Sequence, residues 1–226
     1  MDLDRIVVQV LPILLAVTLH EYAHGWVARR LGDRTAELNG RLTVNPLAHV
    51  DPIGTVVFPL LQLLFPPHRV FFGWARPVPI DPRNFEHPLR GMMWVALGGP
   101  AANLLQLLVC AGLVHLMMAI DPMLPVAIQS APTSVGQQIM VPLLLMAVYG
   151  VQINAVLMAF NLIPIPPLDG SRVAYALLPP SAARRLMSLE RYGLLIIFGL
   201  LVFAPGALHL FVEPVVNVAL ALAGLR

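Results

Sequence analysis

Long apolar runs recur from one end of the chain to the other, and they constrain the fold more than any other feature. Hydrophobic residues make up 58% of the 226 residues and charged residues only 12%, whereas roughly a quarter of the residues in a soluble domain are charged. The mean hydropathy is +0.78, so several segments must be solvated by lipid rather than by water. The composition excludes a soluble globular protein and predicts an all-α polytopic membrane protein.

The basic residues exclude one class of partner. All 14 are arginines, and the formal net charge is only +2. The chain therefore has no polybasic patch that would bind nucleic acid, and we expect no nucleic-acid partner.

We predict a bundle of about five transmembrane helices in one domain that spans residues 1–226. Three apolar runs each predict one helix: Ile6–Trp26, Met92–Ile120 and Met140–Leu162. The C-terminal run, Leu194–Ala223, would be about 45 Å long as a single helix, and Pro205-Gly206 divides it near its middle. This division favours a hairpin of two short spans over one long span.

A shorter apolar run, Ile53–Phe65, contains Pro59 and is too short to cross a bilayer upright. It fits a short re-entrant helix, with Asp51-Pro52 as the N-cap and the first helical residue. If the run re-enters, every arginine except Arg5 lies on one side; if it crosses, the arginines divide between both sides. The positive-inside rule therefore favours re-entry and places the arginine-rich loops in the cytoplasm.

Two loop regions predict small membrane-associated β-hairpin segments. Thr35–Val44 contains Asn39-Gly40 between short runs with apolar residues, which is typical of a tight hairpin turn. Val70–Ile80 mixes aromatic residues and valine with two prolines, which confine it to an edge strand or an irregular one. These segments complete the predicted architecture.

The first predicted helix contains His20-Glu21-Tyr22-Ala23-His24, the H-E-x-x-H pattern. Residues four apart lie on the same face of a helix, so both imidazoles can bind one ion about 2.0 Å from their nitrogens. Glu21 is rotated by about 100° around the helix and can reach a water bound to that ion. Ionisable side chains inside a lipid-facing helix are costly and mark functional sites, and neutral imidazoles with an open fourth position suit zinc.

Two histidines leave a zinc ion in need of a third protein ligand, and Asp169 is the favoured candidate. It follows a proline-rich stretch just past the run Met140–Leu162, where the prolines prevent a regular helix and allow the backbone to fold back into the protein. Both histidines lie toward the same end of their own helix. In the alternative, Asp169 only forms a turn with Gly170, and Glu213 or His49 becomes the next candidate ligand.

These motifs resemble the site-2 protease family of intramembrane zinc metalloproteases. The H-E-x-x-H pattern inside a helix, Gly99–Asn103 in the next long run and Leu168-Asp169-Gly170 after a later one follow the family's order. Asn45-Pro46 and Phe72–Pro79 resemble the small bacterial and archaeal branch, which has no PDZ or CBS module. Pro-Leu-Asp-Gly here replaces the family's usual Asn-Pro-Asp-Gly, a departure shared by that branch.

The resemblance implies a zinc metalloendopeptidase with one zinc ion per chain. His20, His24 and Asp169 would bind the ion, and Glu21 would be the general base. Asn103 is a candidate for polarising the scissile carbonyl, with an interhelical hydrogen bond as its alternative role. The implied substrates are membrane proteins, cut within or near their transmembrane segments in the bilayer of a bacterial or archaeal cell. Regulation would come through membrane partners, lipids or prior trimming of the substrate.

A helical substrate must unwind before it can be cut, and a strand in 35–44 or 70–80 could hold it by strand addition. Two other classes of function are weighed against proteolysis. A metal transporter would usually show internal repeats and polar residues through both leaflets, which the sequence lacks. A catalytically silent scaffold would not need both histidines, the glutamate and the aspartate.

Overall fold

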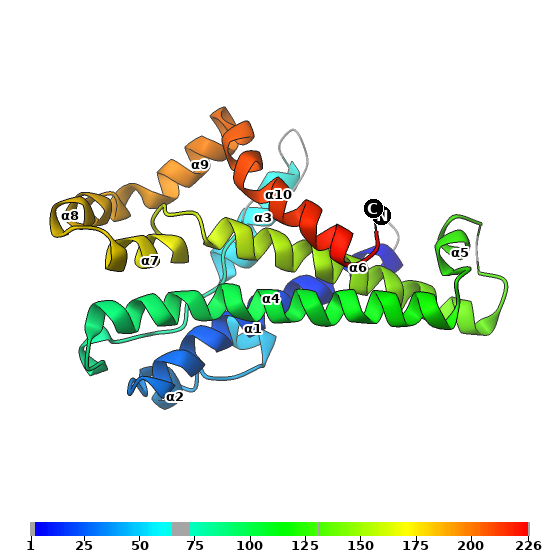
Figure 1. Ribbon diagram of the computed structural model, residues 1–226, viewed down its shortest axis with the longest axis horizontal. Coiled ribbons are helices and arrows are strands. Elements are labelled where there is room, and N and C mark those ends of the chain that lie inside the picture. The colour runs from blue at the N-terminus through cyan, green and yellow to red at the C-terminus, as the bar shows by residue number, and fades with distance from the viewer. Residues whose placement is uncertain (1–2, 65–72, 131, 226) are drawn as a thin grey trace.

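The computed structural model describes residues 3–64, 73–130 and 132–225, and all regular elements among them are helical. α4 and α6 lie side by side along the length of the molecule, α1 crosses them, and α10 packs on α6 (Figure 1). The elements are α1 (Leu3–Arg30), α2 (Thr35–Leu38), η1 (Pro46–His49), η2 (Pro52–Val57), α3 (Phe58–Leu64), η3 (Pro82–Asn84), α4 (Pro88–Ile120), α5 (Leu124–Ser130), α6 (Val135–Asn161), α7 (Asp169–Leu177), α8 (Pro180–Ser188), η4 (Glu190–Tyr192), α9 (Gly193–Phe203) and α10 (Pro205–Leu222). The all-α class is therefore confirmed.

Four stretches of the described residues are helical, long and apolar enough to cross a membrane. They are Pro88–Ile120, Val135–Asn161, Pro180–Phe203 and Pro205–Leu222. The break between α9 and α10 lies at Ala204, next to the proline at which the sequence predicts it. α1 contains the first predicted span but is not among these four, so the count of about five spans is not confirmed.

Small residues let the central helices pack closely. One buried cluster joins α4, α6 and the C-terminal end of α10: Leu107, Ala111, Val151, Ala155, Ala219 and Ala223. Lipid tails are as apolar as leucine, so helices in a bilayer associate through such close van der Waals packing. α1 packs against both α4 and α6, and α7 packs against α4, so this cluster forms the frame on which they are placed.

The re-entrant segment begins as the sequence predicts. The Asp51 side chain accepts hydrogen bonds from the N–H groups of Ile53 (3.0 Å) and Gly54 (2.6 Å), and so caps the π-helical turn η2 that runs into α3. The Trp74 N–H donates to the Gly54 carbonyl (3.2 Å), so the segment that begins at residue 73 lies next to the start of η2. The predicted cap is therefore confirmed, and re-entry of this segment into a bilayer stays a prediction.

The predicted β-hairpin at 35–44 is wrong, because the structure has the short helix α2 followed by a turn. Asp33 accepts a hydrogen bond from the Thr35 N–H (3.0 Å), which turns the chain ahead of α2. Gly40 ends the helix at φ +64°, and the next N–H donates back to the Ala36 carbonyl (2.8 Å). An Asn-Gly pair ends a helix in this way as readily as it turns a hairpin.

The second predicted strand region forms no strand from residue 73 onward, and residues 70–72 lie outside the described residues. The N–H groups of alternate residues, Trp74, Arg76 and Val78, still point to one side, as in an extended chain. In order, they donate to Gly54 O (3.2 Å), His49 O (2.9 Å) and Glu21 Oε2 (3.1 Å). The acceptors belong to three different segments, so the stretch is extended without being part of a sheet.

A buried aspartate joins the loops on either side of the re-entrant segment. Asp33 is 0% exposed and accepts hydrogen bonds from the N–H groups of Thr35 (3.0 Å) and Asp81 (2.8 Å) and from Asn84 Nδ2 (2.7 Å). Burial alone would raise the pKa of this carboxyl, but the hydrogen bonds outweigh it and hold the pKa below its ordinary value.

Asp33→Ala should therefore destabilise the fold by about 2 kcal/mol, because it leaves buried donors without an acceptor. The stabilisation from Asp33 is present above the ordinary pKa of an aspartate and is lost as pH falls through its lowered pKa. Thermal unfolding in detergent, followed by circular dichroism at several pH values, measures both effects. Glu37→Ala, which removes surface ion pairs, is the control and should cost less; an equal cost would contradict the role of Asp33.

Candidate metal centre

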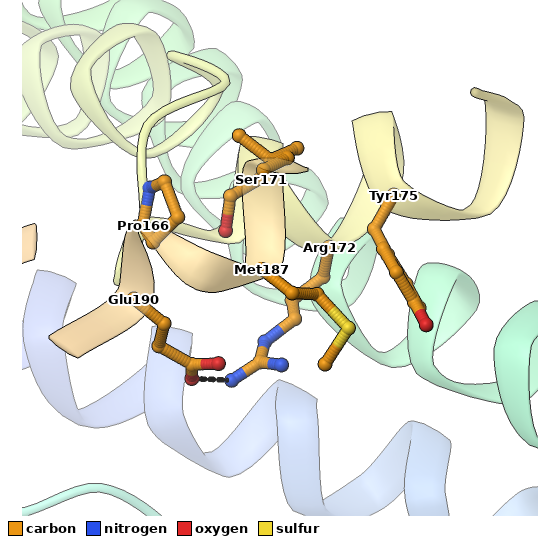
Figure 2. Close-up of a pocket in the computed structure, with 7 residues that line it drawn as sticks. Pro166, Ser171, Arg172, Tyr175, Met187 and Glu190 are labelled. Carbon is orange, nitrogen blue, oxygen red and sulfur yellow. Dashed lines mark hydrogen bonds and ion pairs between the residues drawn. The ribbon is translucent and has the colours of Figure 1, made fainter. Parts of the chain in front are cut away.

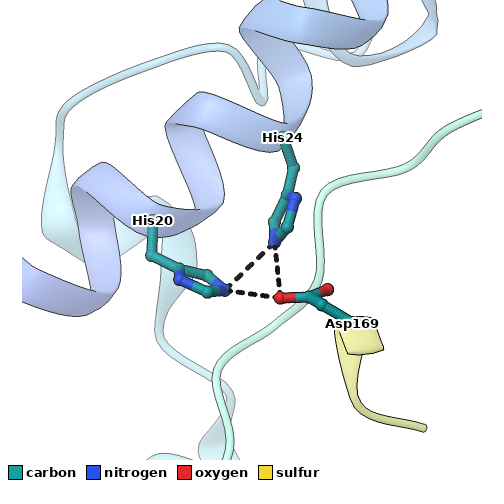
Figure 3. Close-up of side chains that lie close together, drawn as sticks. All are labelled: His20, His24 and Asp169. Atoms are coloured by element: carbon teal, nitrogen blue, oxygen red, sulfur yellow. Dashed lines mark hydrogen bonds and ion pairs between the residues drawn. The ribbon is translucent and has the colours of Figure 1, made fainter. Parts of the chain in front are cut away.

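Three side chains that the sequence predicts as metal ligands converge between α1 and α7 (Figure 3). His20 and His24 project from α1, and their Nε2 atoms lie 3.0 Å apart. Asp169, the first residue of α7, places Oδ2 3.2 Å from Nε2 of His20 and 3.4 Å from Nε2 of His24. Donor atoms bound to a tetrahedral ion at about 2.1 Å lie about 3.4 Å apart, so the spacing fits a metal ion such as zinc.

The hydrogen bond of His24 Nδ1 fixes the tautomer of the neutral ring. Nδ1 lies 2.7 Å from the backbone carbonyl oxygen of Val95 on α4. A carbonyl oxygen can only accept, so Nδ1 carries the hydrogen, and Nε2 of the neutral ring presents a lone pair. A metal-binding histidine is typically held in this way.

Two asparagine side chains in series fix the tautomer of a neutral His20 ring. Asn154 Nδ2 donates to the Gly150 carbonyl (2.9 Å), which leaves Asn154 Oδ1 to accept from Asn103 Nδ2 (2.8 Å). Asn103 Oδ1 then faces His20 Nδ1 at 2.6 Å, so this nitrogen donates and Nε2 again presents a lone pair. Both asparagines are buried, at 0% and 2% exposure, so no water competes for these bonds.

Two imidazole Nε2 atoms and one carboxylate oxygen thus face each other within 3.4 Å. Asp169 Oδ2 is buried and accepts no hydrogen bond from the residues that the structure describes, although two nitrogens lie within 3.4 Å of it. Donor atoms packed this closely are stabilised by a cation among them. Their spacing and their identity fit a zinc ion, which two histidines and a carboxylate favour.

Gly99 of α4 leaves the space that such an ion needs. A Cβ atom at this position would lie 2.5 Å from His24 Nε2 and 2.6 Å from His20 Nε2. These distances are shorter than any non-bonded contact, so a side chain at residue 99 would fill the space between the imidazoles. α4 therefore borders the site with bare backbone.

Asp169 is held in place by a loop that folds back on α7. A Cβ atom on Gly170 would lie 2.1 Å from the Leu162 carbonyl oxygen, so only glycine permits this close approach. Arg172 of α7 donates to the carboxylate of Glu190 in η4, beside a small hollow that includes none of the three ligands (Figure 2). The loop and the ion pair together fix the first turn of α7.

Glu21 follows His20 in the chain but is not part of the ligand cluster. Its Oε2 accepts a hydrogen bond from the Val78 N–H at 3.1 Å. Within the described ranges the carboxylate accepts no other hydrogen bond, so Oε1 is left for a water molecule or a substrate. A carboxylate fixed through one oxygen, with the other unengaged, suits a general base.

The remaining predicted residues do not join the cluster. His49 and Glu213, the alternative ligands, lie outside it in the part of the chain that the structure describes. The Asn103 amide donates into the protein, toward Asn154 and the Ala16 carbonyl (3.4 Å). The structure therefore shows the interhelical hydrogen bond of Asn103, and its role at the scissile carbonyl stays a prediction.

Comparisons with known proteins agree with this site. The chain is 34% identical over 208 residues to "Putative zinc metalloprotease YwhC" of Bacillus subtilis, covering 92% of this chain and 85% of that protein. This chain belongs to the site-2 protease family. It is also 29% identical over 194 residues to "Putative zinc metalloprotease Rip2" of Mycolicibacterium smegmatis, covering 84% of this chain and 64% of that protein. No family model and no solved structure matches the chain.

The motifs of this site-2 protease family member do not reveal two features of its centre. The steric role of Gly99 depends on the packing of α4 across α1, and the tautomer of His20 depends on Asn154. One signal could have found Asn154, because it is a polar side chain inside an apolar run and such residues usually have a structural or functional role in a membrane.

Gly99→Ala should abolish zinc binding, because the added methyl group would occupy the space between the imidazoles. Gly112→Ala is the matched control on the same helix, since a Cβ atom there meets nothing within 4 Å. Elemental analysis of the purified variants should find almost no zinc in the first and the wild-type amount in the second. Equal zinc in both would show that Gly99 does not border the ion.

Asn154→Leu should weaken zinc binding by about 10- to 100-fold, as loss of the groups that orient metal ligands does. The change removes the acceptor that holds the Asn103 amide and, through it, His20. Asn161→Leu is the control on the same helix, because among the described residues Asn161 donates only to the Leu157 carbonyl of that helix (3.0 Å). Zinc affinity can be measured by competition with a chromophoric chelator. Equal affinities of both variants would contradict the role of Asn154 in orienting His20 through Asn103.

Proposed function

We propose that this protein is an intramembrane zinc metalloprotease that hydrolyses peptide bonds within or near the transmembrane segments of membrane proteins. One observation carries the proposal: the ligand atoms of His20, His24 and Asp169 converge within 4.8 Å of one another, with Glu21 next to His20 in the chain. They do so in a chain in which four described helical stretches are long and apolar enough to span a bilayer. Both relatives carry zinc metalloprotease in their names, which supports the same chemistry.

The helices hold the ligands in a preset geometry. His20, His24 and Asp169 would bind zinc, which when bound polarises a peptide carbonyl and lowers the pKa of a coordinated water. The Val95 carbonyl and Asn103 Oδ1 accept from the two Nδ1 atoms and keep both imidazoles oriented. With three protein ligands, a fourth position is left for the reaction.

Glu21 moves the proton in this mechanism. It accepts a proton from the attacking water at Oε1 and delivers it to the leaving amide nitrogen. The hydrogen bond from the Val78 N–H to Oε2 limits the rotation of the carboxylate. A positioned general acid–base of this kind contributes about 10²- to 10⁴-fold to the rate.

An unwound substrate needs an extended partner, and the structure leaves one of the two predicted candidates. The segment 35–44 forms α2 and a turn, so it offers no strand edge. In the segment 73–80, the N–H groups of Trp74, Arg76 and Val78 donate into the protein. In an extended chain the N–H and carbonyl of Ala75, between two of these residues, face the opposite edge. Pro77 and Pro79 have no N–H, so a substrate strand would pair at Ala75 without extending into a longer ladder.

We place the centre toward the cytoplasmic side of a bacterial or archaeal cell membrane. Arg29 and Arg30 lie in the last turn of α1, about two turns beyond the ligand histidines. Cytoplasmic loops carry an excess of arginine, which supports this orientation. The substrate would be a transmembrane protein, and a membrane partner, lipid or prior trimming would regulate its cleavage.

The proposal is tested by zinc content and cleavage measured together. Wild type, His20→Ala, Asp169→Ala and Glu21→Gln are purified in detergent and mixed with a tagged reporter that has one glycine- and proline-containing transmembrane helix. We expect one zinc ion per chain in wild type and Glu21→Gln and none in the two ligand variants. Only the wild type should cleave the reporter.

Three outcomes would count against parts of this scheme. If Glu21→Gln cleaves as well as wild type, Glu21 is not the general base. If Asp169→Ala keeps its zinc, the third ligand lies elsewhere. If wild type holds zinc but never cleaves a membrane reporter, a transport or scaffold function is favoured.

A further inference from the structure

Arg41 carries a buried charge without a direct counter-charge. The residue is 9% exposed, and its guanidinium donates to the carbonyls of Ala48, Arg76 (2.7 Å) and Pro77 (3.3 Å). Among the described residues no carboxylate lies within ion-pair distance of it. A buried cation without compensation is costly, so an anion beyond its direct contacts must balance it.

One peptide bond connects Arg41 to Glu21. The carbonyl of Pro77 accepts from Arg41 (3.3 Å), and the N–H of Val78 in the same peptide donates to Glu21 Oε2 (3.1 Å). This peptide is not among the cis bonds of the structure, so its C=O and N–H point in opposite directions. The cation lies on its oxygen side and the anion on its hydrogen side, which favours both charges.

The influences on the pKa of Arg41 also point to Glu21 as the balancing anion. Burial lowers the pKa of the Arg41 guanidinium, and the nearby charge of Arg76 lowers it further. The Glu21 carboxylate acts in the opposite direction and raises this pKa. Glu21 is therefore the acidic group that offsets the buried charge.

We propose that Arg41 is a positioning residue for Glu21, acting through the peptide between Pro77 and Val78. The inference rests on the proposed function, because it assigns the general-base role to Glu21. Arg41 contacts backbone carbonyls of η1 and of the segment 73–80 and none of the three metal ligands. It therefore affects turnover separately from metal binding.

The first test removes the Arg41 guanidinium in one variant and the Val78 N–H in another. Arg41→Met deletes the charge at similar length, and Val78→Pro deletes the N–H while an extended chain tolerates the ring. Both should lower kcat on the tagged reporter by at least about ten-fold and change KM by less than about two-fold, because Glu21 acts in the chemical step. Zinc content should stay at one ion per chain in both.

Matched variants separate this role from a structural one. Val78→Ala shortens the side chain but keeps the N–H, so it should lose much less kcat than Val78→Pro. Arg41→Lys keeps the charge and should recover part of the activity lost in Arg41→Met. In the Val78→Pro background, Arg41→Met should add little further loss, because both changes break the same link.

A second readout does not depend on activity. In zinc-free protein, the unfolding temperatures of Arg41→Met, Glu21→Gln and the double variant form a cycle. Since each charge compensates the other, the double variant should lose less than the sum of the two single losses. Additive losses would overturn the link between the two residues.

The outcomes also distinguish this inference from the proposed function. If wild type binds no zinc and cleaves nothing, the proposed function fails. If wild type cleaves and both Arg41→Met and Val78→Pro keep its kcat, only the positioning role fails. If Arg41→Met does not fold, Val78→Pro still decides, because it leaves the contacts of the guanidinium with Ala48 and Arg76 in place.

Discussion

Two imidazole nitrogens and a carboxylate oxygen that face one point inside an apolar helix bundle are stabilised by a cation among them. His20, His24 and Asp169 form such a point, and the packing around them follows from it. α4 must present bare backbone, which explains Gly99. Each imidazole must donate from its other nitrogen, which explains why Asn103 and a backbone carbonyl face them. The arrangement of α1, α4 and α7 therefore fits the proposed metal site as well as it fits apolar packing.

The sequence predicts those parts of the structure that depend on residues within one element. Two histidines four apart share a helix face whatever the helix packs against, so His20 and His24 could be paired from their spacing. Prolines ahead of Asp169 end a helix on local steric grounds, and the break before Pro205 follows from the same rule. The cap at Asp51 likewise needs only the next few residues.

Other features could not be predicted because they depend on contacts between distant segments. Asn39-Gly40 is compatible with a hairpin turn and with a helix end, and the burial of Ala36 accompanies the second outcome. The donor to Glu21 is the backbone of Val78, 57 residues away. A backbone N–H has no sequence signature, so no motif reveals which segment will supply it. The partner of Asn103 is a side chain on another helix, so the sequence marks Asn154 as a polar residue in an apolar run without showing what it contacts.

The proposed metal ligands and the proposed general base have separate supports. Helices α1, α4 and α7 fix the ligands, whereas the side chain of Glu21 is held by a segment that precedes α4 and is anchored by Arg41. Buried charges are often replaceable by apolar residues with no loss of stability, so stability alone does not account for a buried arginine here. Orientation does, because a guanidinium can hold successive carbonyls of an extended segment at fixed angles. A chain built in this way can keep its metal centre intact while the alignment of its base depends on the loop.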